Sequence, residues 1–143
     1  MRIYLDHNAT TPVAPDVADA MTAALRTTFG NPSSVHTDGQ QAKTALDEAR
    51  SAVARLLGAE PTEIVFTSGG SEADNLAIRG AAEALAGSGR RHLVASAIEH
   101  EAVLQTLKAL AKQGWTTTLV GVDASGVVAP ERVAEAPTDH TAL

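Results

Sequence analysis

The chain has 143 residues, of which 44% are hydrophobic and only 3% aromatic, and its formal net charge is −6. An acidic chain without a basic patch lacks the footprint of a nucleic-acid binder. There is no cysteine, so disulfides, thiolate metal sites and a cysteine nucleophile are excluded within this sequence. No apolar run approaches the roughly 18 residues of a membrane span, and the first residues do not resemble a signal peptide. We therefore expect a cytoplasmic protein with no membrane partner.

The first part of the chain predicts two helices. Apolar residues recur at helical spacing over 15–25, and a Gly-, Asn- and Pro-rich loop follows at 29–36. The segment 41–57 gives the clearest helical pattern, and Gly58 stands where a left-handed C-cap belongs. We expect residues 1–58 to form an N-terminal arm with its helices.

From residue 59 the pattern changes to alternating strands and helices. Short apolar runs predict strands, and amphipathic stretches between them predict helices. The expected strands are 63–67, 92–96 and 116–122, the expected helices are 71–86, 100–113 and 130–136, and 139–143 resembles the start of a further strand. This β-α-β-α-β order predicts an α/β fold with a mostly parallel sheet, of which 59–143 forms an incomplete first part.

The junction at 64–75 is the strongest local candidate for a binding site. The turn Ser68-Gly-Gly-Ser71 separates an expected strand from a helix. Glycines let the backbone approach an anion, and the N–H groups of the helix start point at it. The alternative is a tight turn with a plain helix start, in which Ser71 and Asp74 form a capping box. The turn is neither a Walker A loop nor a dinucleotide-binding fingerprint.

Four segments resemble, in order, the N-terminal signatures of cysteine desulfurases of the NifS/IscS-like branch. They are Tyr4-Leu-Asp-His-Asn-Ala-Thr-Thr-Pro12, Phe29-Gly-Asn-Pro-Ser-Ser34, Ile64-Val-Phe-Thr-Ser-Gly-Gly-Ser-Glu-Ala-Asp-Asn-Leu-Ala77 and Ile98-Glu-His-Glu-Ala-Val103. The resemblance covers nearly the whole chain. It implies the large domain of a fold-type I pyridoxal-phosphate enzyme of the aminotransferase class V family.

The resemblance also implies an activity and a site. Family members transfer sulfur from L-cysteine as an enzyme persulfide, leave L-alanine, and supply an acceptor or scaffold protein for iron–sulfur cluster or thio-cofactor assembly, usually as homodimers. By the match, Gly70 and Ser71 hold the phosphate of pyridoxal 5′-phosphate. His100 matches the catalytic histidine that stacks on the pyridine ring and acts in proton transfer. From the residues alone, a solvated position at a helix start is the favoured interpretation of His100.

Other residues near these motifs are open to two interpretations. His36 closes a loop that in the family lies near the active-site mouth, and it is a further candidate. Glu72 and Asn75 could contact the cofactor region, although helix capping and solvent exposure explain them as well. The histidines show no metal-ligand spacing, so we expect no metal. No role is assigned to three residues of the arm that approaches the substrate in relatives: Asn8, Ala9 and Thr10.

None of the lysines in this sequence is interpreted as the lysine that binds the cofactor. Lys43, Lys108 and Lys112 fall off the apolar stripes of their expected helices and are interpreted as solvated surface residues. None matches the family's cofactor-binding lysine, which lies beyond residue 143, as does the sulfur-carrying cysteine. We therefore expect a truncated chain that is inactive alone. It should be unstable or aggregate in isolation, because strand edges and apolar helix faces would be uncovered.

Two alternatives remain open. Another enzyme of the class V aminotransferase fold, such as a selenocysteine lyase, would share the same N-terminal architecture. A non-catalytic fragment that binds a phosphate ligand or a partner subunit would need neither the lysine nor the cysteine.

Overall fold

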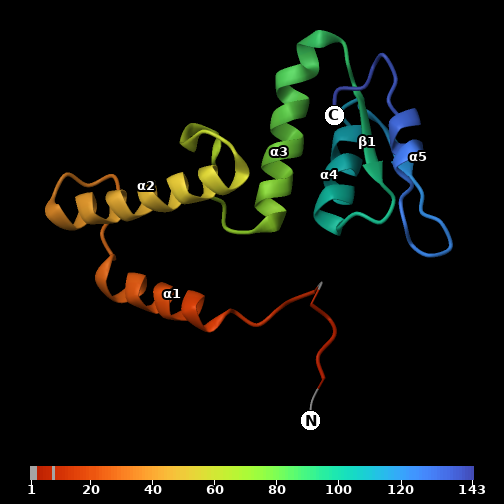
Figure 1. The fold of residues 1–143 in the computed structure, drawn as a ribbon. Coiled ribbons are helices and arrows are strands. Elements are labelled where there is room, and N and C mark those ends of the chain that lie inside the picture. The colour runs from red at the N-terminus through yellow and green to blue at the C-terminus, as the bar shows by residue number, and fades with distance from the viewer. Residues whose placement is uncertain (1–2, 8) are drawn as a thin grey trace. The chain divides into compact units, whose positions relative to one another are not determined.

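The computed structural model describes residues 3–7 and 9–143, and the chain divides into two compact units between Val65 and Phe66. The first unit contains the helices α1 (Pro15–Thr27) and α2 (Thr37–Leu57) and the 3-10 helix η1 (Pro61–Glu63) (Figure 1). The second contains α3 (Gly70–Leu85), the 3-10 helix η2 (Ala86–Ser88), β1 (His92–Ser96), α4 (Glu101–Ala111), β2 (Thr116–Val120) and α5 (Pro130–Glu135). The expected domain boundary at 58/59 stays a prediction.

Helix α2 begins four residues before the expected start. His36 caps it, because the imidazole Nδ1 accepts a hydrogen bond from the Gly39 amide at 3.4 Å. The helix ends as predicted at Gly58, which has a φ of +66° and donates its N–H to the carbonyls of Ala54 and Arg55. This left-handed position suits glycine because it has no Cβ.

The expected strand at 63–67 is wrong. Glu63 belongs to η1, where its carboxylate accepts a hydrogen bond from the Glu60 amide at 2.8 Å and its own amide bonds to the Glu60 carbonyl at 2.9 Å. Ile64 is extended, with φ −92° and ψ 123°, but the sheet formed by the described residues has two strands, β1 and β2. Ile64 is thus extended as expected, but the run 63–67 is not a strand of this sheet, because strand pairing depends on a neighbouring strand.

The second unit is built on a parallel β-α-β motif. β1 and β2 pair in register from His92 with Thr116 to Ser96 with Val120, and α4 connects them. Helices α3 and α4 lie side by side next to the sheet (Figure 1). The core between these elements consists of Ala82, Leu93, Leu107, Leu110 and Trp115. This arrangement confirms the expected α/β fold with parallel strands.

The last residues extend the sheet on the other edge of β1. Thr141 forms a parallel bridge with His92, and the Val94 amide donates to the Leu143 carbonyl at 2.8 Å. The prediction that 139–143 starts a further strand is thus confirmed as β-type pairing. Across residues 3–7 and 9–143, no helix is long and apolar enough to cross a membrane.

Candidate functional site

The start of α3 presents open hydrogen-bond donors. The N-cap residue Gly69 is extended and has no side chain, so no side chain caps the helix. A Cβ built on Gly69 or Gly70 would meet no atom within 4 Å. Ser71 is exposed, and its hydroxyl bonds to no other side chain in the described part of the chain. Uncapped N–H groups, an open approach and a free hydroxyl together fit an anionic group such as a phosphate.

The turn before α3 is stabilised by Glu72 and not by the expected capping residue Ser71. The predicted capping box of Ser71 and Asp74 is wrong, because Ser71 lies inside the helix rather than at its N-cap. Instead, Glu72 reaches back, and its Oε2 accepts hydrogen bonds from the Ser68 hydroxyl and the Ser68 amide, both at 2.7 Å. These two bonds, the hydroxyl first, hold the pKa of Glu72 below its ordinary value. The turn therefore also carries a negative charge at neutral pH.

His100 lies at the start of the next helix. It is the N-cap of α4, and its Nδ1 accepts a hydrogen bond from the Ala102 amide at 3.1 Å. A ring nitrogen that accepts a hydrogen bond carries no proton, so the neutral ring is protonated at Nε2. The residue is exposed. Its Nε2 is thus the ring atom available for proton transfer.

Ser71 and His100 lie at the same end of the second unit. Helix α3 leads into β1 and helix α4 follows it, so both helices begin at the end of the unit where β1 stops (Figure 1). The structure therefore presents an uncapped helix start and an exposed imidazole on neighbouring helices.

Asn75 links these two helices and does not stand free for a ligand. Its amide nitrogen donates to the Ser71 carbonyl at 2.9 Å, and its oxygen accepts from the hydroxyl of Thr106 at 2.9 Å and from Nε of Arg79 at 3.1 Å. Thr106 is only 2% exposed. The sequence analysis missed Thr106, although a hydroxyl on the apolar stripe of α4 is a detectable signal.

The remaining candidates cap a helix or are exposed. His36 serves as the α2 cap described above and lies in the first unit. The amides of Ala9 and Thr10 bond to the Asp6 carbonyl at 3.2 and 3.3 Å in an exposed turn, and Asn8 lies outside the described residues. The lysines are exposed, as predicted: Lys43, Lys108 and Lys112.

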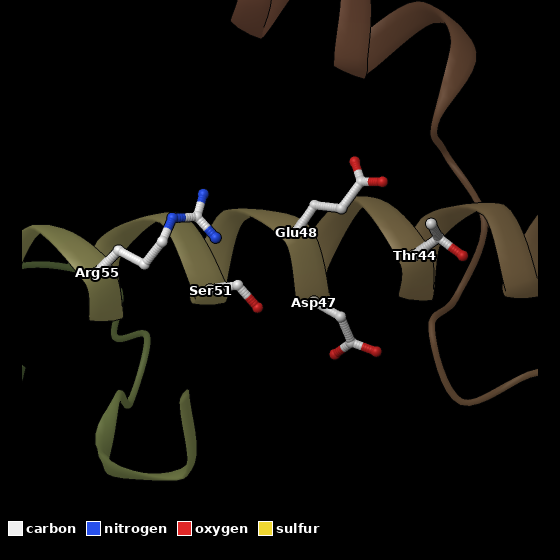
Figure 2. Close-up of a pocket in the computed structure, with 5 residues that line it drawn as sticks. All are labelled: Thr44, Asp47, Glu48, Ser51 and Arg55. Atoms are coloured by element: carbon white, nitrogen blue, oxygen red, sulfur yellow. The ribbon is translucent and has the colours of Figure 1, made fainter. Parts of the chain in front are cut away.

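A surface depression on α2 is separate from these residues. Figure 2 shows its lining side chains, which all come from this one helix, with Asp47 and Glu48 extending from opposite sides of the ribbon. Two exposed carboxylates do not suit an anionic cofactor. Within the ranges 3–7 and 9–143, no group of three or more His, Cys, Asp or Glu side chains could hold a metal ion.

Fold and sequence together define a chain of the class V aminotransferases. Residues 3–143 match the model of the family described as Aminotransferase class-V, and the chain belongs to this family. Among curated proteins, it is 44% identical over 141 residues to "Cysteine desulfurase IscS" of Dictyoglomus turgidum, covering 99% of this chain and 36% of the relative. It is 48% identical over 141 residues to "Cysteine desulfurase" of Nostoc sp., covering 99% of this chain and 35% of the relative.

Solved structures with similar folds have related names. A "NIFS-LIKE PROTEIN" superimposes with a TM-score of 0.88 at 38% identity, over 99% of this chain and 38% of the other. A structure titled "SspA in complex with cysteine" gives a TM-score of 0.82 at 41% identity, over 93% of this chain and 38% of the other. The chain thus spans about a third of the length of the curated relatives it matches.

Proposed function

We propose that this chain supplies the phosphate site and the proton-transfer histidine of a pyridoxal-phosphate-dependent cysteine desulfurase. The observation that carries the proposal is the open start of α3 at Gly70 and Ser71, on the helix beside the one that His100 caps. The names of relatives at 44–48% identity support it. So does a neighbouring structure whose title includes cysteine.

The residues of the proposed site would have different roles. The Gly70 and Ser71 amides, with the Ser71 hydroxyl, would hold the phosphate, because a helix start favours a dianion. Bound pyridoxal phosphate would supply an electron sink for carbanion chemistry. His100 would cover the cofactor ring and would donate or accept a proton at Nε2, since the Ala102 amide occupies Nδ1.

The proposed reaction converts L-cysteine and an enzyme thiol to L-alanine and an enzyme persulfide. The thiol and the cofactor-binding lysine would come from residues outside this sequence, because it holds no cysteine and its three lysines are exposed. We further propose a cytoplasmic homodimer that passes sulfur to an acceptor or scaffold protein for iron–sulfur cluster assembly, without nucleic-acid or membrane partners.

The test uses the polypeptide purified from its source cells. With pyridoxal phosphate, L-cysteine and a thiol reductant, we expect alanine and sulfide in equal amounts. Ser71→Ala should weaken cofactor binding and His100→Ala should slow alanine formation, whereas the exposed control Lys112→Ala should do neither. No alanine from the wild-type polypeptide, despite bound cofactor, would contradict the desulfurase activity and favour a role in binding alone.

A further inference from the structure

We propose that Asn75 and Thr106 are positioning residues that hold the phosphate-binding turn of α3 at a fixed place relative to His100. The inference rests on the proposed function of Ser71 and His100. In this role the two residues do not contact the ligand. They fix the alignment of α3 and α4 that the ligand requires.

The first half of the link lies on α3. The Asn75 side-chain amide donates to the carbonyl of Ser71, one helical turn earlier, at 2.9 Å. Arg79, one turn later, donates from Nε to the Asn75 side-chain oxygen at 3.1 Å. The Asn75 amide group is thereby fixed along the helix, and its donor side is bound to Ser71, the residue that we propose to hold the phosphate.

The second half of the link lies on α4. The Thr106 hydroxyl is 2.9 Å from the Asn75 oxygen and 2.7 Å from the Ala102 carbonyl. The Ala102 amide in turn donates to His100 Nδ1 at 3.1 Å. Hydrogen bonds therefore run from Ser71 through Asn75 to Thr106, and Thr106 lies one helical turn after Ala102, the residue whose amide donates to His100.

The donors and acceptors fix the direction of these bonds. A flipped Asn75 amide would place its NH₂ against Arg79 Nε and its oxygen against the Ser71 carbonyl, which would make two repulsive pairs. The Thr106 hydroxyl has one proton and two acceptors within reach. Because the Asn75 oxygen can only accept, the hydroxyl is the donor of this bond, and the Ala102 carbonyl is a second acceptor for the same proton.

Burial makes the link selective for one alignment of the helices. Thr106 is 2% exposed, so a shift of α4 along α3 would leave its buried hydroxyl without the half-buried Asn75 amide as a partner. A cofactor held by its phosphate on one helix and by its ring on the other requires that alignment, because small misplacements of bound groups are costly. The pair should thus act on cofactor affinity as well as on stability.

The experiment compares four single variants of the full chain and the double variant that combines Thr106→Val with Asn75→Ala. Thr106→Val keeps the shape and removes the hydroxyl, Thr106→Ser restores a hydroxyl, and Asn75→Ala removes the amide. Gln105→Ala is the matched control, because Gln105 is exposed on α4 and its side chain donates to Glu101 on its own helix. The measurements are the dissociation constant of pyridoxal phosphate by equilibrium dialysis, the exchange rate of the Ala102 amide by NMR, and the unfolding midpoint.

We expect Thr106→Val and Asn75→Ala each to raise the dissociation constant about tenfold, the loss typical of one hydrogen bond. Their combination should be no worse than either alone, because both break the same link. The Ala102 amide should exchange faster in Thr106→Val, while Thr106→Ser and Gln105→Ala should stay near wild type in both measurements.

Two results would overturn the inference. One is a lower unfolding midpoint in Thr106→Val with cofactor affinity and Ala102 exchange unchanged, which would make the pair purely structural. The other applies if the wild-type chain binds no pyridoxal phosphate, a result that would contradict the proposed function itself. The exchange rates of the Ala102 amide then test the positioning role alone. Equal Ala102 exchange in Thr106→Val and Thr106→Ser would then reject the positioning role.

Discussion

His100 and His36 perform the same local task at the starts of two helices. Each ring accepts a backbone N–H through Nδ1, from Ala102 at 3.1 Å and from Gly39 at 3.4 Å. The exposed Nε2 of His100 would serve the cofactor ring, whereas His36 has only the capping role in our account. Substitutions at the two residues can therefore distinguish the loss of a helix cap from the loss of the proposed proton-transfer group.

Substitution of His100 should show this separation. Asparagine is a good N-cap without an imidazole, so His100→Asn should keep the free energy of unfolding near that of the wild type. His100→Ala should lose about 1 kcal/mol of stability. Both should slow alanine formation at least ~100-fold, the usual contribution of a general acid or base. Chemical denaturation and alanine release measure the two effects.

His36→Ala is the matched control. It should lose a similar amount of stability and form alanine at the wild-type rate, because its only role in our account is to cap α2. Alanine formation by His100→Asn at the wild-type rate would contradict the proton-transfer role.

Glu72 should make the turn before α3 sensitive to acid. Its bonds from Ser68 lower its pKa in the folded chain below the ordinary value of 4.5. A carboxylate with a depressed folded pKa stabilises the fold above its unfolded pKa, and this contribution is lost as the pH falls through the folded pKa. Glu72→Gln should remove that acid-dependent loss. It should also bind inorganic phosphate more tightly at pH 7, because a like charge is gone.

The measurements are denaturation from pH 3 to 7 and phosphate binding at pH 7. Glu83→Gln is the control, since Glu83 is exposed near the other end of α3. An identical acid dependence of stability in Glu72→Gln and the wild type would show that the Ser68 bonds contribute nothing.

At the scale of elements, the sequence predicted those features that depend on local residues. The strand at 92–96 and the Gly58 C-cap were predicted correctly. The strand at 63–67 was not, since strand pairing depends on distant residues. The early start of α2 was missed because histidine is an uncommon N-cap.

In the candidate site, too, the features that depend on local residues were predicted and those that depend on packing were not. The open turn at Gly70 and Ser71 follows from its own residues, and so does the position of His100 at a helix start. The bond between Asn75 and Thr106 joins residues 31 positions apart, so no local pattern reveals it. Only the packing of α4 on α3 brings the two side chains together.

His92 connects three segments of the sheet and should be important for its stability. The side chain is 8% exposed, with Nδ1 2.7 Å from the Thr141 hydroxyl and Nε2 2.8 Å from the Thr118 hydroxyl. His92→Ala should lower the free energy of unfolding by about 1–3 kcal/mol, because it removes two hydrogen bonds of a buried ring. Urea denaturation measures the loss.

His140→Ala is the control for this prediction. The His140 side chain is exposed, and its carbonyl would still accept the His92 amide. Equal stabilities of His92→Ala and His140→Ala would show that the ring contributes nothing to the pairing of the last residues.

At the scale of the whole molecule, apolar surface should govern how the chain behaves alone. No residue of α1 is buried, and Val17, Met21 and Leu25 are 48%, 56% and 78% exposed along one side. Exposed apolar patches of this kind cause association. We expect the isolated chain to scatter light and to bind a hydrophobic dye.

A double substitution tests the cause of that association. Met21→Glu with Leu25→Glu should reduce the scattering, whereas Ala23→Glu, on the opposite side of α1, should reduce it less. A wild-type chain that stays monomeric at high concentration and unfolds cooperatively would contradict the expectation.

The most direct test of the central claim is the ³¹P NMR signal of pyridoxal phosphate titrated with the polypeptide purified from its source cells. A phosphate held at the start of α3 should show a shifted signal that no longer follows the pH of the solution, because the bound dianion is stabilised. Ser71→Ala should weaken this change, and Lys112→Ala should leave it intact. A signal that stays at its free position, or that shifts equally in Ser71→Ala, would contradict the phosphate site and the function built on it.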